Sequence, residues 1–176
     1  MKPADELRHL LGSVNPEERV EGFLIVFKAR CNGNAKQVLQ NCREVLSVVL
    51  RQYGKPWPSE DEWLDLLPQW FIRRCAPERT LEEEEQDLSR WRTLSREEQL
   101  QELENEQWSV MEWIGWFDLY EPRYWFWWDA VVKCPNLLLV AVELVDFTFP
   151  TGSLEWLLKA SGAIEVEEML DEIWSR

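Results

Sequence analysis

Residues 124–149 read YWFWWDAVVKCPNLLLVAVELVDFTF, and this stretch decides the fold class. Its first part, Tyr124 to Val132, is aromatic and β-branched, which is typical of strands. Lys133-Cys134-Pro135-Asn136 is a turn signal, and Leu137 to Phe149 is again rich in strand-forming residues. The pattern predicts a β-hairpin. A helix over 124–132 is the alternative, because propensity alone settles few such cases.

Two strands alone are only marginally stable in water, so this hairpin must pack on helices or pair with another strand. The remainder of the chain favours helices. The strongest pattern runs over residues 35–53, where apolar side chains recur at helical spacing and Gly54 marks the end. Further helices are predicted over residues 4–11, 16–29, 105–121, 154–160 and 164–174.

Capping boxes mark three helix starts in the middle of the chain: Ser59 with Glu62, Thr80 with Glu83, and Ser95 with Glu98. The predicted fold class is therefore α+β and predominantly helical, with helices packed around a small C-terminal β-hairpin or sheet; an all-α fold is the alternative. The length fits a single domain over residues 1–176, helical over 4–121, with the β-hairpin plus two helices over 122–176.

Negative charge is concentrated in the middle of the chain. The net charge is −14, and residues 59–121 carry 18 acidic and 6 basic side chains, whereas residues 1–58 carry 6 acidic and 9 basic ones. Such a balance disfavours a nucleic-acid partner, which requires positive charge to neutralise phosphates. A field of one sign steers partners of the opposite sign, so we expect the partner to be another protein of basic character.

The densest acidic run follows the Thr80 cap. It consists of Glu82, Glu83, Glu84, Glu85 and Asp87. Such runs are commonly solvated first turns, favoured by the helix dipole. The functional interpretation is a docking surface for a basic partner, since complementary charge speeds encounter.

Tryptophan is unusually abundant, with 12 residues in the chain. Core packing is the ordinary role of such rings. In a regular strand Trp125 and Trp127 share one face and Trp128 lies on the other. A hairpin open to solvent on one side would therefore leave an aromatic patch, and such patches mark interaction sites. Trp125, Trp127 and Trp128 are the candidate binding residues.

Acidic side chains also occur among the apolar strand residues, at Asp129, Glu143 and Asp146. Buried carboxylates can act as general acids, but no spacing rule links these three, and a structural role is the alternative. His9 lies in an ordinary amphipathic helix without a nucleophile nearby, so we expect it to be structural or exposed. No catalytic residue is assigned.

The four cysteines, at positions 31, 42, 75 and 134, form no CxxC pair and have one histidine to accompany them. We therefore expect free thiols that behave as small apolar residues, and neither a metal nor a cofactor. Free thiols indicate a reducing compartment. The chain shows no apolar N-terminal segment and no apolar run of the ~18 residues that a spanning helix needs. A cytoplasmic protein without a membrane partner is predicted.

These features predict a non-enzymatic protein-binding protein. Its most specific form would be an inhibitor of a basic effector, because small acidic immunity and antitoxin proteins share its size and charge. One alternative is a hydrolase-like enzyme with a carboxylate-based cleft. The other is a structural subunit of a larger assembly, in which the hairpin completes a sheet in another chain.

Overall fold

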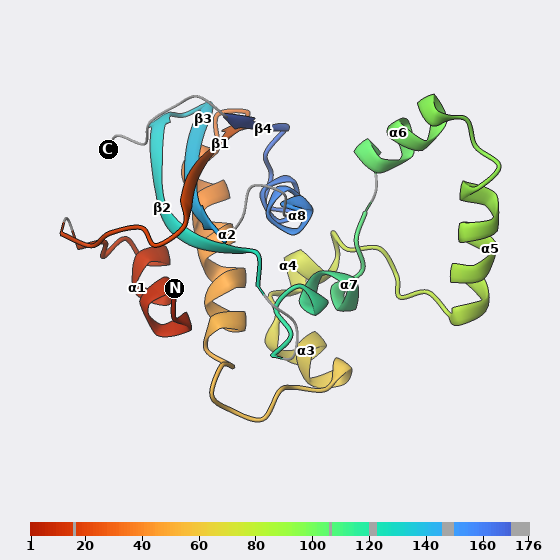
Figure 1. Ribbon diagram of the computed structural model, residues 1–176, viewed down its shortest axis with the longest axis horizontal. Helices are drawn as coiled ribbons and strands as arrows, with labels where there is room; N and C mark the ends of the chain where they lie inside the picture. The colour runs from red at the N-terminus through yellow and green to blue at the C-terminus, as the bar shows by residue number, and fades with distance from the viewer. Residues whose placement is uncertain (16, 106, 120–122, 146–149, 170–176) are drawn as a thin grey trace.

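The computed structural model describes residues 1–15, 17–105, 107–119, 123–145 and 150–169, with the backbone alone for residues 103–105. Its centre is a four-stranded antiparallel sheet in the order β2-β3-β1-β4 (Figure 1). The strands are β1 (Phe23–Arg30), β2 (Trp125–Cys134), β3 (Leu137–Leu144) and β4 (Glu165–Met169).

The helices fall into three groups. Helices α1 (Pro3–Leu10), α2 (Ala35–Leu50) and α8 (Gly152–Ala160) pack with the strands, with α2 across one face. Helices α3 (Glu60–Leu66), α4 (Gln69–Ile72) and α7 (Val110–Gly115) gather near the C-terminal end of α2. Helices α5 (Leu81–Trp91) and α6 (Arg96–Asn105) stand apart at one end of the molecule (Figure 1).

The prediction of a predominantly helical fold with a small C-terminal hairpin is wrong, and so is the all-α alternative. The chain is 43% helical and 21% strand, a mixed α+β fold built on the four-stranded sheet. Two segments predicted as helices form strands instead. Strand β1 replaces the second half of the helix predicted over 16–29, and β4 lies where a helix was predicted over 164–174. Residues 170–174 of the latter are outside the described part of the chain.

Strand β1 forms because both of its edges are paired. It pairs with β3 from Phe23↔Leu144 to Arg30↔Leu137, and with β4 over Val26–Arg30. Val26 on one face of the strand and Ile25 and Phe27 on the other are all buried, so the middle of β1 is covered on both faces. A short run that is apolar on both faces shows no alternation, so its pattern matches a buried helix as well as a central strand.

The predicted helix over 105–121 is also too long, because α7 covers only Val110–Gly115. Ser109 caps it: its Oγ accepts the N–H of Glu112 at 3.2 Å, and its own N–H donates to the Glu112 carboxylate at 2.7 Å. The three predicted capping boxes are confirmed, at the starts of α3, α5 and α6. Helix α2 (Ala35–Leu50) confirms the predicted helix over 35–53 except for its last three residues, and Gly54 has a positive φ in the turn that follows.

Strands β2 and β3 confirm the predicted hairpin and add a bulge. Trp127 pairs with Val142, whereas Asp129 pairs with the next residue, Ala141, so Trp128 is the extra residue. A bulge bends an edge strand and re-aims its side chains. It therefore breaks the regular alternation predicted for the three hairpin tryptophans.

Aromatic rings join the sheet to the α3–α4–α7 group. Centroids of Phe71 and Trp113 lie 4.9 Å apart, those of Trp113 and Phe117 4.8 Å, and those of Phe117 and Trp125 5.7 Å. The indole N–H groups of Trp113 and Trp125 both donate to Ser153 at the start of α8, to its carbonyl and its hydroxyl. The tryptophans of this region therefore hold the layers together.

The cysteines are free thiols, as predicted. Cys31 and Cys42 are buried, Cys75 is half-buried and Cys134 is exposed. Burial raises the pKa of Cys42 to about 12, so this thiol stays neutral and packs as a small apolar side chain.

The entry into β1 provides a test of the strand pairing. A Cβ at Gly22 would lie 2.1 Å from the Leu144 carbonyl oxygen, whereas a Cβ at Gly115 would meet nothing within 4 Å. We expect Gly22→Ala to lower the free energy of unfolding by about 1–3 kcal/mol, because the backbone of β1 must move away from β3. Urea unfolding followed by tryptophan fluorescence measures it. Equal stability of Gly22→Ala and the control Gly115→Ala would contradict this register.

Candidate functional site

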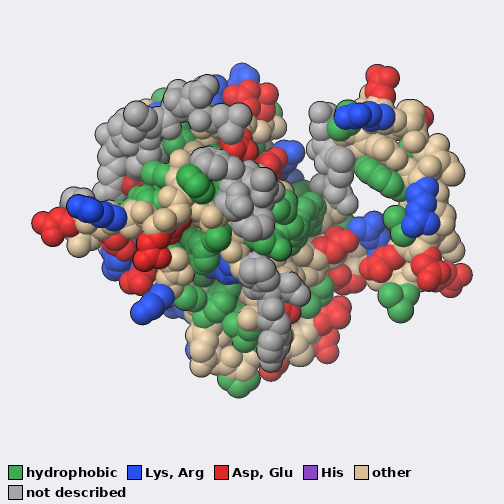
Figure 2. All heavy atoms as spheres, in the orientation of Figure 1, with side chains coloured by type: hydrophobic (Ala, Val, Ile, Leu, Met, Phe, Trp, Pro, Cys, Tyr) green, Lys and Arg blue, Asp and Glu red, His purple; other side chains and the backbone are tan. Residues whose placement is uncertain are grey.

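The predicted acidic docking surface lies on the α5–α6 hairpin, which we call the acidic arm (residues 81–105). The arm carries nine acidic and three basic side chains, a net charge of −6. None of the residues of α5 is buried. Figure 2 shows an open notch between the arm and the rest of the molecule. Helix α5 therefore presents its side chains largely to solvent instead of packing them on the fold.

Half of the arm's described acids already have partners. Glu83 and Glu98 close capping boxes, Asp87 pairs with Arg79, and Glu102 pairs with Arg90. The other described acids, Glu82, Glu84, Glu85 and Glu97, have no ion-pair or hydrogen-bond partner within the described ranges. The negative charge of the arm is therefore largely uncompensated.

Leucines lie among these free acids. Leu81, Leu88 and Leu100 are 80%, 50% and 54% exposed. Residues three and four apart on a helix are neighbours, so Glu84 and Glu85 each lie beside both Leu81 and Leu88 on one side of α5. Figure 2 shows hydrophobic side chains of the arm on the side that faces the notch. The side of α5 that carries Leu81, Glu84, Glu85 and Leu88 is thus mixed, acidic and apolar together, and we call it the mixed face.

The root of the arm is fixed to the body. The Ala76 N–H donates to the Trp108 carbonyl at 3.0 Å, which ties the chain entering the arm to the chain leaving it. Arg79 then bridges two helices, with its guanidinium nitrogens 3.1 Å from Asp87 of α5 and 2.5 Å from Glu112 of α7. These contacts orient the arm although its helices bury little.

The three candidate tryptophans lie in the core. Trp125, Trp127 and Trp128 are 3%, 0% and 7% exposed. The Trp128 ring, re-aimed by the bulge, packs edge-on against His9 with centroids 4.6 Å apart. Phe117, just after α7, packs against Trp125. These rings therefore expose little area, although Trp128 still lines a surface cavity beside the start of α1.

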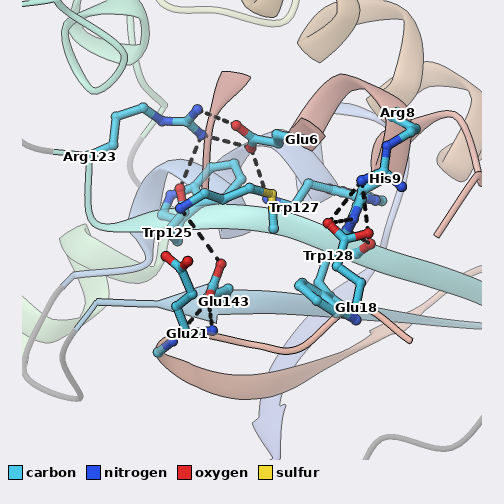
Figure 3. Close-up of polar contacts among 12 residues, drawn as sticks. Glu6, Arg8, His9, Glu18, Glu21, Arg123, Trp125, Trp127, Trp128 and Glu143 are labelled. Atoms are coloured by element: carbon cyan, nitrogen blue, oxygen red, sulfur yellow. Dashed lines mark hydrogen bonds and ion pairs between the residues drawn. The ribbon is translucent and has the colours of Figure 1, made fainter. Parts of the chain in front are cut away.

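A buried ion pair that was not predicted from the sequence joins α1 to the segment just before β2 (Figure 3). The Glu6 carboxylate accepts the Trp127 N–H at 2.8 Å and pairs with the Arg123 guanidinium, with Nη2 at 2.9 Å from Oε1. Arg123 lies over the rings of Phe126 and Phe117, 4.7 Å and 5.0 Å from their centroids. Glu6 is fully buried, so this pair holds the segment before β2 against α1.

His9, one turn further along α1, is also fully buried. Its Nδ1 lies 3.0 Å from the Trp128 carbonyl and its Nε2 lies 3.0 Å from the Glu18 carboxylate (Figure 3). Arg8 also binds Glu18, at 2.8 Å and 2.9 Å, and this hydrogen bonding lowers the pKa of the Glu18 carboxyl. Glu6 and His9 are three residues apart beside buried Leu10, and this spacing in the sequence could have indicated a polar pair on the buried face.

Together these groups close the outer edge of β2 at its bulge. Glu6 binds the N–H of Trp127, His9 the carbonyl of Trp128, and the Asp129 carboxylate the N–H of Ala130 at 2.9 Å. An open strand edge is a template for pairing with another chain, and side chains that occupy its backbone groups block it. The hairpin is thus poorly suited at this point to complete a sheet in another chain.

The described strand carboxylates, Glu143 and Asp129, both accept backbone N–H groups. Glu143 accepts the N–H groups of Glu21 and Gly22 at 2.6 Å and 2.9 Å, while Asp129 binds its neighbour's N–H. Glu143 lines a surface cavity of about 340 Å³, and Asp129 is not among the lining residues. Asp146 lies outside the described residues. Within the described ranges, no three His, Cys, Asp or Glu side chains are arranged to hold a metal ion.

Comparisons with known proteins add no relative. No protein-family model matches this sequence, no curated protein matches it, and no solved structure matches the fold. In the part of the chain that is described, no helix has both the length and the apolar character needed to cross a membrane.

The Glu6–Arg123 pair yields a prediction for stability. Glu6→Gln would leave the buried guanidinium without its counter-charge, so we expect it to lower the free energy of unfolding by about 3–5 kcal/mol. Glu102→Gln is the matched control, because the Arg90–Glu102 pair is solvated and should contribute at most about 1 kcal/mol. Urea unfolding of both variants measures the difference. Equal losses of unfolding free energy in the two variants would show that the buried pair stabilises the fold no more than the solvated one.

The capping boxes of the arm predict its pH dependence. Hydrogen bonds from the Thr80 backbone and hydroxyl lower the pKa of Glu83, and those from the Ser95 hydroxyl and backbone lower that of Glu98. A lowered pKa in the folded state means that the stabilisation is complete above the ordinary value of 4.5 and is lost as the pH falls through the lowered pKa.

We therefore expect the amides of α5 and α6 to lose protection from hydrogen exchange in acid, before those of β1 and β3. Hydrogen exchange followed by nuclear magnetic resonance, from neutral pH down to pH values below the lowered pKa values, measures the order in which these amides lose protection. In the variant with Glu83→Gln and Glu98→Gln, the hydrogen-exchange protection of the α5 and α6 amides should depend less steeply on pH. If the arm of that variant lost protection in acid as the wild type does, the capping boxes would be ruled out as the cause of that loss.

Proposed function

We propose that this chain is a non-enzymatic protein-binding protein that docks a basic partner through the acidic arm. The observation that supports this most is the combination of free acids and exposed leucines on a hairpin that is fixed at its root. Burying leucines stabilises a fold, so leucines left exposed on a projecting element gain nothing for this chain alone. Exposed apolar groups next to charged ones are typical of an interaction surface.

The negative charge of the arm indicates that the partner's surface is basic. The arm alone has a net charge of −6 within a chain of net charge −14. This field speeds the encounter with a basic surface and weakens as salt screens it, over a Debye length of about 8 Å at physiological ionic strength. Association should therefore be faster at low salt, while the leucines contribute a part of the affinity that salt does not screen.

In its most specific form, the proposal is that the chain neutralises a basic effector by covering its positive surface, as immunity and antitoxin proteins do. A reducing cytoplasm is the proposed location, since it would keep a thiol as exposed as Cys134 reduced. The enzyme alternative has less support, because Glu143 and Asp129 are occupied by backbone N–H groups. The structural-subunit alternative has less support because Glu6 and His9 occupy the edge of β2.

Site-specific cross-linking tests the proposal. A photo-reactive amino acid replaces Leu88 on the arm or, as a control, exposed Ile164 on the body, and each tagged protein is irradiated in an extract of the organism that carries the gene. We expect a basic protein to cross-link at position 88 and not at position 164. The yield should fall when Glu84→Gln and Glu85→Gln are combined, because the attracting charge is removed.

The matched charge control is Glu60→Gln with Asp61→Gln, two exposed acids in the first turn of α3. This control should leave the cross-link at position 88 unchanged. Cross-links of equal yield at both positions, an acidic partner, or equal effects of the two charge variants would contradict the proposal.

A further inference from the structure

We infer that the partner contributes a basic amphipathic helix, which packs against the mixed face of the arm and completes a three-helix bundle with α5 and α6. This inference rests on the proposed function and specifies the element of the partner that is recognised. It follows from three features of the arm: an incomplete apolar interior, a geometry fixed by polar contacts, and acids placed directly beside the leucines.

The arm has the apolar side chains of a bundle without its third member. Leu88 and Leu100 are exposed, and Trp91 and Leu94 near the turn are only half-buried. A helix in a bundle covers its apolar stripe against two neighbours. Here α5 and α6 are each other's neighbour, and the open notch seen in Figure 2 lies where a third helix could pack. One more helix would remove the remaining apolar surface from water.

Polar contacts hold the two helices in position without that core. Arg90 binds Glu102 with both guanidinium nitrogens, at 2.6 Å and 3.0 Å, and the Gln99 side chain donates to the Trp91 carbonyl at 3.0 Å. Arg79 fixes the other end. A surface that is already ordered loses less conformational entropy on binding, which favours recognition by this face.

The acids specify a basic helix. Leu81, Glu84, Glu85 and Leu88 form one continuous patch on α5, and none of the four has a polar or ionic partner among the described residues. A partner helix with an apolar stripe flanked by Lys or Arg would match both components. A strand would match less well, because the backbone groups within α5 and α6 are engaged in their helices and no sheet edge is available there.

A second copy of this chain is the competing occupant. The two copies would bring together arms of net charge −6 on bodies that are also acidic, so repulsion opposes this arrangement. The notch is therefore better matched by a molecule of opposite charge.

Designed peptides test the inference on the intact protein. The probe is a labelled Leu–Lys peptide of about 18 residues, long enough to form a helix, with leucines at a and d positions. Its control has the same composition in scrambled order, so charge is constant and amphipathicity is lost. Fluorescence anisotropy at physiological salt measures binding. We expect the scrambled peptide to bind at least about tenfold more weakly, a difference of about 1.4 kcal/mol.

Variants of the arm locate the binding. We expect Leu81→Ser with Leu88→Ser, and separately Glu84→Gln with Glu85→Gln, each to weaken the amphipathic peptide about tenfold. These side chains are exposed, so the fold should persist, and circular dichroism confirms it. Leu11→Ser with Ile164→Ser, two exposed apolar residues on the body, is the matched control and should bind as the wild type does.

Equal binding of the two peptides, or wild-type binding by the Leu81→Ser/Leu88→Ser variant, would overturn the inference. So would a wild-type dimer in sedimentation that this variant abolishes, since a second copy would then fill the notch. Each of these outcomes leaves the cross-link at position 88 standing. Loss of that cross-link, by contrast, would contradict the proposed function itself.

Discussion

The pairing of β1 with β3 is the interaction on which the rest of the structure depends. Eight residues of β1, Phe23–Arg30, run antiparallel to Leu137–Leu144, which makes β3 a central strand with neighbours on both sides. That pairing gives α2 a sheet to cover. It also leaves β2 at an edge, where Glu6 and His9 of α1 take up the backbone groups at the bulge. The aromatic residues of α7 then extend the core to the α3–α4 group.

How well the sequence predicts each element depends on how local its determinants are. The capping boxes at Thr80 and Ser95 involve residues three positions apart, and the α2 stripe and the turn at Pro135 are equally local, so all were predictable. Strands β1 and β4 were not, because their identity depends on distant partners. The short acidic segment Glu165–Met169 is a strand because its backbone pairs with β1, from Val26↔Met169 to Arg30↔Glu165. Arg30 and Lys28 of β1 also form ion pairs with Glu165 and Glu167 across this ladder.

The same distinction applies to the candidate site. The acidic run at Glu82–Glu85 is visible in the sequence, since charge requires no tertiary information. The isolation of the arm is not visible, because nothing local shows that α5 fails to pack on the body. The hairpin tryptophans looked available for binding, yet Trp128 packs against His9 of α1, and Trp125 packs against Phe117 and donates to Ser153. The Glu6–Arg123 pair joins distant parts of the chain, and Glu6 and Arg123 each resemble an ordinary surface charge in the sequence.

The acidic arm, on the proposal made above, has no complete core of its own and gains one from a partner. Native-state hydrogen exchange measures this most directly, amide by amide, in the free protein and with a saturating basic amphipathic helix. The account predicts that amides of α5 and α6 exchange far faster than those of β1 and β3 in the free protein, and that only the arm slows markedly on binding. Arm amides that are already as protected as the sheet, or that do not respond to the bound helix, would contradict it.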